Sequence, residues 1–486
     1  MPDSTHPALL QCVIFGASAM LRGRMHSLHS MPPSSSLLDR TLSAIARRYR
    51  LPEFQIDSSQ IQELSPETAL ALIIEQARIE KTRDSTAVAA LQQRFIDSLA
   101  RLIASAMHPR TGDAVFQATL LRYREPTVSE YASLSSQAER DRRSIHAAVN
   151  SMAHPERHQR MPPGEQREWL GRLYEAAAAS SWAQAEDSAR RLLDLADADV
   201  EASVKRRTQQ LLDSGALARL QRLQALEDDE LVGRYRSLWD RHGPRSGSAA
   251  AAAQGVASKH RGAEVEALAT RALEAFAERL GKEEAHTSYR VVTSMRVPAS
   301  IPSSHEHAKT EWDVVLLRHA GTSGDTATWD ICLLVEAKAS VDAASTDLPR
   351  LLRGLRLLAH ADANANYAFE TQQGVVHVRG ASLTALPTEG DRLANTVLYC
   401  CDAPADSSPR LLNAASRMQL LSAPESVAYA SMLTDNPHAD ACTLEPVWQA
   451  LLESPRWRVI LDQYAILRQA RDLMVHTDDL LAAMRS

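Results

Sequence analysis

The sequence predicts an α+β fold in which a helical N-terminal region, a small mixed sheet and a helical C-terminal region follow one another. Apolar residues at helical spacing dominate residues 37–241 and return over residues 403–486. Apolar runs of strand length are confined to about residues 289–401. With 486 residues, 44% of them hydrophobic, the chain can bury several cores, and we expect about three domains.

Residues 1–36 are expected to be disordered, because the polar segment MPPSSS precedes the first clear helical pattern. The moderately apolar stretch before it is followed rather than preceded by Arg22 and Arg24, which is the wrong charge order for a secretory signal. The sequence leaves open whether Met1 or Met31 is the start. No apolar run approaches the length of a membrane span, so we expect no membrane partner.

Residues 37–241 are predicted to form an all-helical domain. Ser65 and Pro66 make an N-cap and first-turn pair, and the next helix repeats apolar residues every four positions, at Leu91, Phe95, Leu99 and Ile103. The following segment, residues 242–258, is rich in small residues and contains glycine, which is typical of a linker. We place the main domain boundary there.

A central domain is predicted over residues 259–402. It opens with an amphipathic helix over residues 259–281, which ends at a glycine. Residues 289–297 predict the first strand, and short apolar runs at residues 374–378 and 395–401 predict later ones.

Residues 310–340, TEWDVVLLRHAGTSGDTATWDICLLVEAKAS, indicate two apolar strands joined by a polar loop. Asp313 lies on the first strand, and Glu336 and Lys338 lie on the second. Residues two apart in a strand point to the same side, about 6 to 7 Å apart, so we expect the three side chains to meet at one sheet edge. Two carboxylates can hold a hard divalent cation, and an ammonium beside them can orient or deprotonate a water molecule. A simple ion pair between Lys338 and Glu336 is the alternative, although two residues apart is an awkward separation for it.

At these residues the chain resembles the PD-(D/E)XK nuclease superfamily, whose core runs αβββαβ. Mrr-like restriction nucleases and Holliday-junction resolvases are also similar at the first helix, where Arg261, Gly262 and Glu266 match their spacing. The resemblance covers residues 259–402, with a longer gap between the two strand acids than compact relatives have. It implies that Mg²⁺ or Mn²⁺ is bound by three carboxylates and that a lysine positions the attacking water; the catalytic residues would be Glu266, Asp313, Glu336 and Lys338.

Three other acids compete for these roles. Glu264 competes with Glu266 on the helix, and the resemblance favours Glu266. Glu311 shares a strand face with the first strand acid and is expected to be solvated. Asp330 precedes Glu336 by about 20 Å along an extended strand, so we interpret it as a strand-entry residue that cannot share an ion with Glu336.

A helix is predicted over residues 346–360, with Thr346 as its N-cap and Pro349 in its first turn. Arg350, Arg353 and Arg356 recur every three residues and gather on one side, opposite a leucine-rich side. A solvated face is the plain interpretation. Within a nuclease core, contacts to nucleic-acid phosphates are the functional one.

Composition excludes several other classes. A net charge of −6 argues against a charge-driven polymer binder. The five cysteines lack C-x-x-C spacing, so buried thiols in a reducing cytoplasm are expected. Serine hydrolase, P-loop and dinucleotide-binding motifs are missing from the sequence.

The expected function is therefore a metal-dependent nuclease that hydrolyses phosphodiester bonds, with DNA as the expected substrate, in restriction, defence or repair. The helical regions would select or sense the substrate, and they are candidates for contacts in a homodimer or with a partner protein. The alternative is a non-catalytic scaffold that binds nucleic acid or protein through a degenerate nuclease core.

Overall fold

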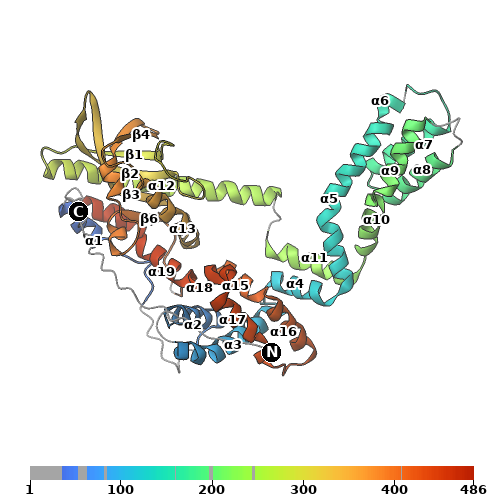
Figure 1. Cartoon of the computed structure of the whole chain (residues 1–486), viewed down its shortest axis with the longest axis horizontal. Helices are drawn as coiled ribbons and strands as arrows, with labels where there is room; N and C mark the ends of the chain where they lie inside the picture. Colours follow the sequence, from blue (N-terminus) through green and yellow to red (C-terminus); the bar gives the residue numbers. More distant parts are fainter. Residues whose placement is uncertain are drawn as a thin grey trace, which may run out of the picture.

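The computed structural model describes residues 36–52, 63–80, 85–158, 160–195, 201–243, 247–406 and 408–486. The described chain is α+β, with a small sheet preceded and followed by helices, as the sequence predicts (Figure 1). The disorder expected for residues 1–36 falls, apart from Ser36, outside the described residues.

The sheet of the described chain has seven strands in the order β2-β1-β4-β5-β3-β6-β7, and β2 also pairs with β3. The first three strands form an antiparallel meander, whereas β6 is parallel to β3 and β7 is parallel to β6, so the sheet is mixed. The strands are β1 (Tyr289–Arg296), β2 (Glu311–Ser323), β3 (Thr326–Ala337), β4 (Asn366–Thr371), β5 (Gly374–Arg379), β6 (Val397–Cys401) and β7 (Met474–His476).

Strand β7 lies in the C-terminal region that was expected to be helical. Its three residues are all buried, at the edge of the sheet beside β6. A run this short carries no period-two signal, so the sequence pattern could not reveal it.

Both faces of the sheet are covered by helices, because alternate strand residues point to opposite sides. Leu334 of β3 packs into one core, and its neighbours Leu333 and Val335 pack into another. The first core contains α13 (Val341–Leu358), α14 (Gly380–Thr384), the 3₁₀ turn η2 (Asp391–Asn395) and part of α19 (Gln463–Leu473). The second contains α1 (Ser36–Ala44), α12 (Ala249–Glu283) and α20 (Thr477–Arg485).

Helix α12 begins at Ala249, well before the predicted residue 259, so most of the expected linker is helical. Ser248 caps it, since its Oγ accepts a hydrogen bond of 3.2 Å from the backbone N–H of Ala251. The alanine run in this segment forms helix instead of the expected linker, because alanine has the highest helix propensity of any residue type. Residues 252–261 are all exposed, and burial starts only at Val265.

Helix α13 also begins earlier than predicted, at Val341 rather than near Thr346. Its N-cap is Ser340, whose Oγ accepts from the backbone N–H of Ala343 at 3.2 Å, and Pro349 lies inside the helix. The predicted cap and first-turn proline were therefore wrong. The apolar stripe continues in phase through Val341 and the later leucines, and its burial outweighs the roughly 3 kcal/mol that an internal proline costs.

The remaining helices form two further cores. One joins segments from both ends of the sequence, including Leu91, Phe95, Leu99 and Ile103, all of them buried. As predicted, Ser65 caps its first helix, with Oγ accepting from the backbone N–H of Thr68 at 3.3 Å. The elements of this core are α2 (Pro66–Glu80), α3 (Ser85–Met107), α4 (Ala114–Arg124), α15 (Ala414–Leu421), α16 (Pro424–Asp435), η3 (Ala441–Leu444), α17 (Glu445–Glu453), η4 (Pro455–Trp457), α18 (Arg458–Leu461) and the first part of α19.

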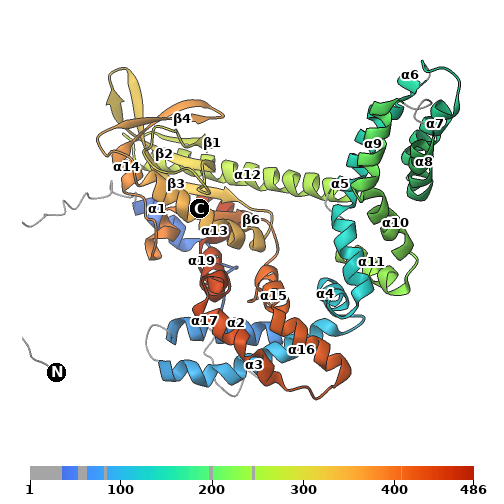
Figure 2. The ribbon, with the colours of Figure 1, turned by 45° about the vertical axis from the view of Figure 1, so that its right-hand side comes forward.

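The last core is a helical arm that stands apart from the sheet (Figure 2). The exposed part of α12, residues 252–261, runs from the sheet toward the base of this arm (Figure 1). None of the described helices is both long and apolar enough to cross a membrane. The arm contains α5 (Pro126–Ala153), α6 (Pro155–His158), α7 (Glu165–Ala178), α8 (Trp182–Asp194), α9 (Ala202–Asp213), α10 (Ala216–Leu226) and α11 (Glu230–His242).

Candidate active site

Asp313 and Glu336 lie together where β2 and β3 pair. Val314 of β2 pairs with Val335 of β3. Because the strands are antiparallel, Asp313 and Glu336 are the next pair and lie side by side. The backbone N–H of Asp313 donates to Glu336 Oε1 at 3.4 Å, and Asp313 Oδ2 accepts from the backbone N–H of Ala337 at 2.8 Å. The convergence expected from strand periodicity is thus present for these two acids.

Lys338 follows the end of β3 and reaches the same point. Its Nζ lies 3.4 Å from Glu336 Oε2 and 3.2 Å from Asp347 Oδ2 on α13. The expectation that a separation of two residues disfavours a direct ion pair between Lys338 and Glu336 was therefore wrong. Tyr399 donates its hydroxyl to Asp347 at 3.2 Å, so Asp347 is itself oriented from the neighbouring strand β6.

Lys309 is a second lysine at this site, and no motif or periodicity in the sequence points to it. Its side chain is 6% exposed, and its Nζ lies 2.5 Å from Glu336 Oε2 and 3.8 Å from Asp313 Oδ1. It precedes β2 in a loop without apolar periodicity. The only sequence signal was its position four residues before Asp313.

Glu266 lies on α12, the helix that packs against β1, β2 and β3. It is partly buried, and its pKa is raised by burial, then by the negative charges of Asp313 and Glu311, while Lys309 opposes the shift. The charge of Asp313 thus contributes to the raised pKa of Glu266. Glu264, its rival, is exposed and instead pairs with His260 at 3.3 Å.

The buried carboxyl of Glu336 is the electrostatic centre of the site. Burial and then the charge of Asp313 raise its pKa to about 8, against the opposing effect of Lys309 and Lys338. For Lys338, burial lowers the pKa, but Glu336 and Asp347 outweigh burial and leave the pKa above its ordinary value. The lysine therefore stays charged at neutral pH.

The other acids of the sheet do not take part. Glu311 is half-exposed and pairs with Arg296 at 3.5 Å, in keeping with the expected solvated role. Asp330 is 1% exposed within β3, where it pairs with Arg379 at 2.5 Å and with Arg318 at 3.4 Å. The interpretation of Asp330 as a strand-entry residue was wrong, since it is a buried ion-pair partner inside the strand.

The three arginines of α13 are exposed on one side of the helix, opposite the buried leucines, as predicted. They are not equivalent. Arg350 Nη1 lies 3.9 Å from Asp347 Oδ1, and Arg353 Nε donates to the backbone carbonyl of His307 at 2.8 Å. Arg356 is exposed, and its backbone carbonyl lies 2.7 Å from Nδ1 of His360.

The donor set fits a hard divalent cation in its chemistry, because carboxylate oxygens are the ligands that Mg²⁺ and Mn²⁺ prefer. The Lys309 ammonium contacts both Asp313 and Glu336, so the two carboxylates already reach one shared cation position. Glu266 would complete the set. Within the described ranges, however, no group of three or more His, Cys, Asp and Glu side chains is already gathered as a metal site.

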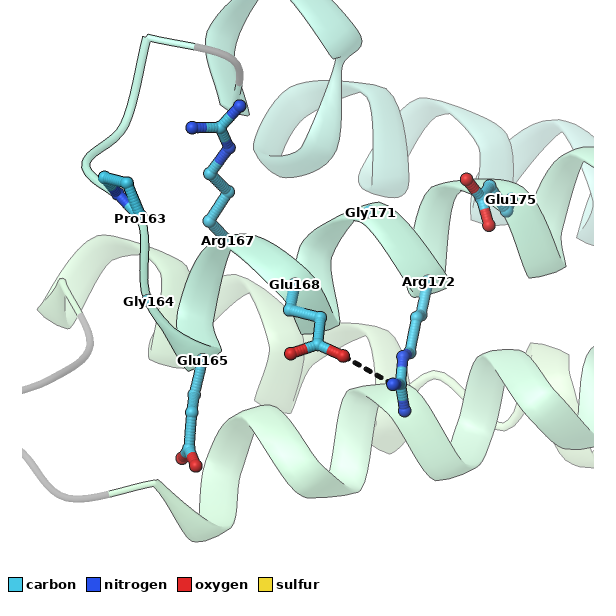
Figure 3. Close-up of a pocket in the computed structure, with 8 residues that line it drawn as sticks. All are labelled: Pro163, Gly164, Glu165, Arg167, Glu168, Gly171, Arg172 and Glu175. Atoms are coloured by element: carbon cyan, nitrogen blue, oxygen red, sulfur yellow. Dashed lines mark hydrogen bonds and ion pairs between the residues drawn. The ribbon is translucent and has the colours of Figure 1, made fainter.

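A surface hollow of about 690 Å³ lies far from this cluster, on α7 of the arm (Figure 3). Its lining is polar, and Glu168 and Arg172 form an ion pair within it. Nothing in its lining is shared with the carboxylate cluster.

No protein-family model matches this chain, and neither a curated protein nor a solved structure matches it. The function of the chain is therefore inferred from the geometry of the site itself.

Proposed function

We propose that this chain is a metal-dependent nuclease that hydrolyses phosphodiester bonds, most naturally those of DNA, in restriction, defence or repair. One observation supports the proposal above all. Asp313 and Glu336 approach one cation position at paired strand ends, with the Lys338 ammonium 3.4 Å from Glu336. Two acids that can hold a divalent cation, with a lysine beside them, are groups that can carry out metal-dependent phosphodiester hydrolysis.

In this proposal Glu266, Asp313 and Glu336 hold Mg²⁺ or Mn²⁺. When bound, the cation supplies a Lewis acid and lowers the pKa of a water molecule. Lys338 orients that water and offsets charge on the phosphate, while Asp347 acts as a positioning residue for Lys338. The exposed guanidinium groups of α13 bind neighbouring phosphates without reading sequence.

The test is a cleavage assay on plasmid, linear, branched and RNA substrates with Mg²⁺ or Mn²⁺. Lys338→Met is expected to lower the cleavage rate by about 100-fold or more, because a positioned charge at the reacting phosphate is lost. Lys282→Met, an exposed lysine at the end of α12, is the matched control and should cleave at the parent rate. Cleavage that persists in excess chelator, or an unimpaired Lys338→Met, would contradict the proposal.

A non-catalytic scaffold is the second candidate. It is favoured by the two ammonium groups that already neutralise Glu336, a pattern that a purely structural ion-pair network would also have. A folded chain that binds nucleic acid but takes up no Mn²⁺ and cleaves none of the substrates would support this candidate.

A further inference from the structure

Lys309 occupies an unusual place for a lysine. Its side chain is 6% exposed, and its Nζ lies 2.5 Å from Glu336 Oε2, the same oxygen that lies 3.4 Å from Lys338 Nζ. It also lies 3.8 Å from Asp313 Oδ1. Lys309 is thus the group that links the two strand carboxylates.

The two lysines differ in what else they contact. Lys338 shares its charge between Glu336 and Asp347, which belongs to α13 and not to the proposed metal-binding set. Both carboxylate partners of Lys309 belong to the proposed metal-binding set. An ammonium held between two carboxylates stands in for a cation that both would bind.

The segment that carries Lys309 is fixed against α13. The backbone N–H of Lys309 donates to the carbonyl of Arg350 at 3.1 Å, and Arg353 holds the carbonyl of His307 at 2.8 Å. Gly354 permits this approach, because a Cβ at that position would lie 2.8 Å from Lys309 Cβ. Packing against α13 therefore fixes the backbone from which the Lys309 ammonium reaches the two carboxylates.

We propose that Lys309 is a built-in counter-ion that occupies the divalent-cation position and must leave it before a metal ion binds; the inference rests on the proposed nuclease function. An ammonium and a divalent cation cannot share one carboxylate oxygen pair, because they repel each other and Mg²⁺ needs oxygen at about 2.0 to 2.1 Å. Lys309 keeps the buried acids paired until the ion arrives, and weakens metal affinity as a result.

Isothermal titration calorimetry with Mn²⁺ on the full chain, without nucleic acid, tests this inference. Lys309→Met is expected to bind Mn²⁺ at least about tenfold more tightly than the parent, because no ammonium has to be displaced. Lys309→Arg keeps the charge and should show no gain. Lys338→Met removes a charge from the same carboxylate and should gain less than Lys309→Met.

Equal affinities for the parent and Lys309→Met, or equal gains for Lys309→Met and Lys338→Met, would overturn the counter-ion role while leaving the metal site intact. If neither the parent nor Lys309→Met binds Mn²⁺, the nuclease proposal and this inference both fail.

A second measurement on the unaltered chain does not depend on the folding of any variant. Reductive methylation followed by mass spectrometry should label Lys309 slowly without metal and faster with saturating Mg²⁺, since the side chain leaves its buried position. Labelling of the exposed Lys282 should not change. Labelling of Lys309 that is unaffected by Mg²⁺ would overturn the inference.

Discussion

Glu336 is the residue on which the proposed chemistry of the site depends. It is fully buried, and its partners are two lysine ammonium groups and a backbone N–H. A carboxylate in such a place is costly to ionise unless it is paired. The two lysines offset only part of the cost of ionising Glu336 in a buried position. The pKa of Glu336 therefore stays above its ordinary value.

This pKa predicts how metal affinity depends on pH. Since a cation binds only the ionised carboxylate, a proton must leave Glu336 below its pKa of about 8. Mn²⁺ affinity should therefore rise with pH, by up to about tenfold per unit, and level off above about pH 8. Calorimetry across this range checks the slope. Glu336→Gln, which cannot ionise, should bind weakly and without the slope, and an affinity independent of pH in the parent would contradict the prediction.

At the scale of elements, α13 joins three tasks. Its apolar stripe packs on the sheet, its Asp347 orients Lys338, and its backbone and Arg353 hold the segment that carries Lys309. Substitutions on this helix therefore act on the site even when they touch none of the proposed metal ligands. Arg353→Ala would remove the proposed phosphate contact and the support of the Lys309 segment together.

Gly354→Ala tests the support of the Lys309 segment by itself. Its Cβ would meet Lys309 Cβ and the Lys309 carbonyl oxygen, both at 2.8 Å, so the segment has to move. We expect a loss of about 1–3 kcal/mol in the free energy of unfolding, the usual cost of overpacking, measured by urea denaturation. Gly262→Ala in α12 is the control, because nothing lies within 4 Å of its new Cβ, and it should gain about 0.5–1 kcal/mol. Equal effects at the two glycines would show that the Lys309 contact is loose.

At the scale of the whole molecule, separate cores are joined by few connections. α19 contributes to the sheet core and to the core built around α2 and α3. Helix α4 contacts both α11 of the arm and α16. The exposed part of α12, residues 252–261, joins the arm to the sheet without packing against either (Figure 1). Its helical form alone sets the span that it bridges.

Val256→Pro tests that role of α12. An internal proline costs a helix about 3 kcal/mol, so the exposed span should break or kink, while the cores keep their thermal stability because Val256 is 70% exposed. Pulsed electron paramagnetic resonance between spin labels on α8 and α13 should give a broader distance distribution. Gly255→Ala, which meets no neighbour, should leave the distribution unchanged or narrower. An unchanged distribution in Val256→Pro would mean that other contacts hold the arm.

The parts of the site that strand periodicity governs could be predicted from the sequence, and the rest could not. Asp313 and Glu336 came together because alternation and antiparallel pairing are local rules. Lys309 escaped prediction because it lies in a loop, where a lysine ordinarily indicates only solvent exposure. The exposed part of α12 was predicted to be a linker because its small, low-complexity residues are typical of linkers. The prediction was wrong because alanine also has the highest helix propensity. β7 was missed because its position is fixed by tertiary pairing alone.

The distribution of the cores along the sequence has a consequence for the order in which the protein folds during synthesis. The arm core is built from residues between Val128 and Val232, so it can form as soon as that stretch leaves the ribosome. The core around α2 and α3 must wait for Leu411 to Leu467, and one face of the sheet must wait for Val475 and Met484. The apolar side chains of α2 and α3 that pack against these C-terminal segments thus stay uncovered for most of translation. We expect a chaperone that binds nascent chains to bind there.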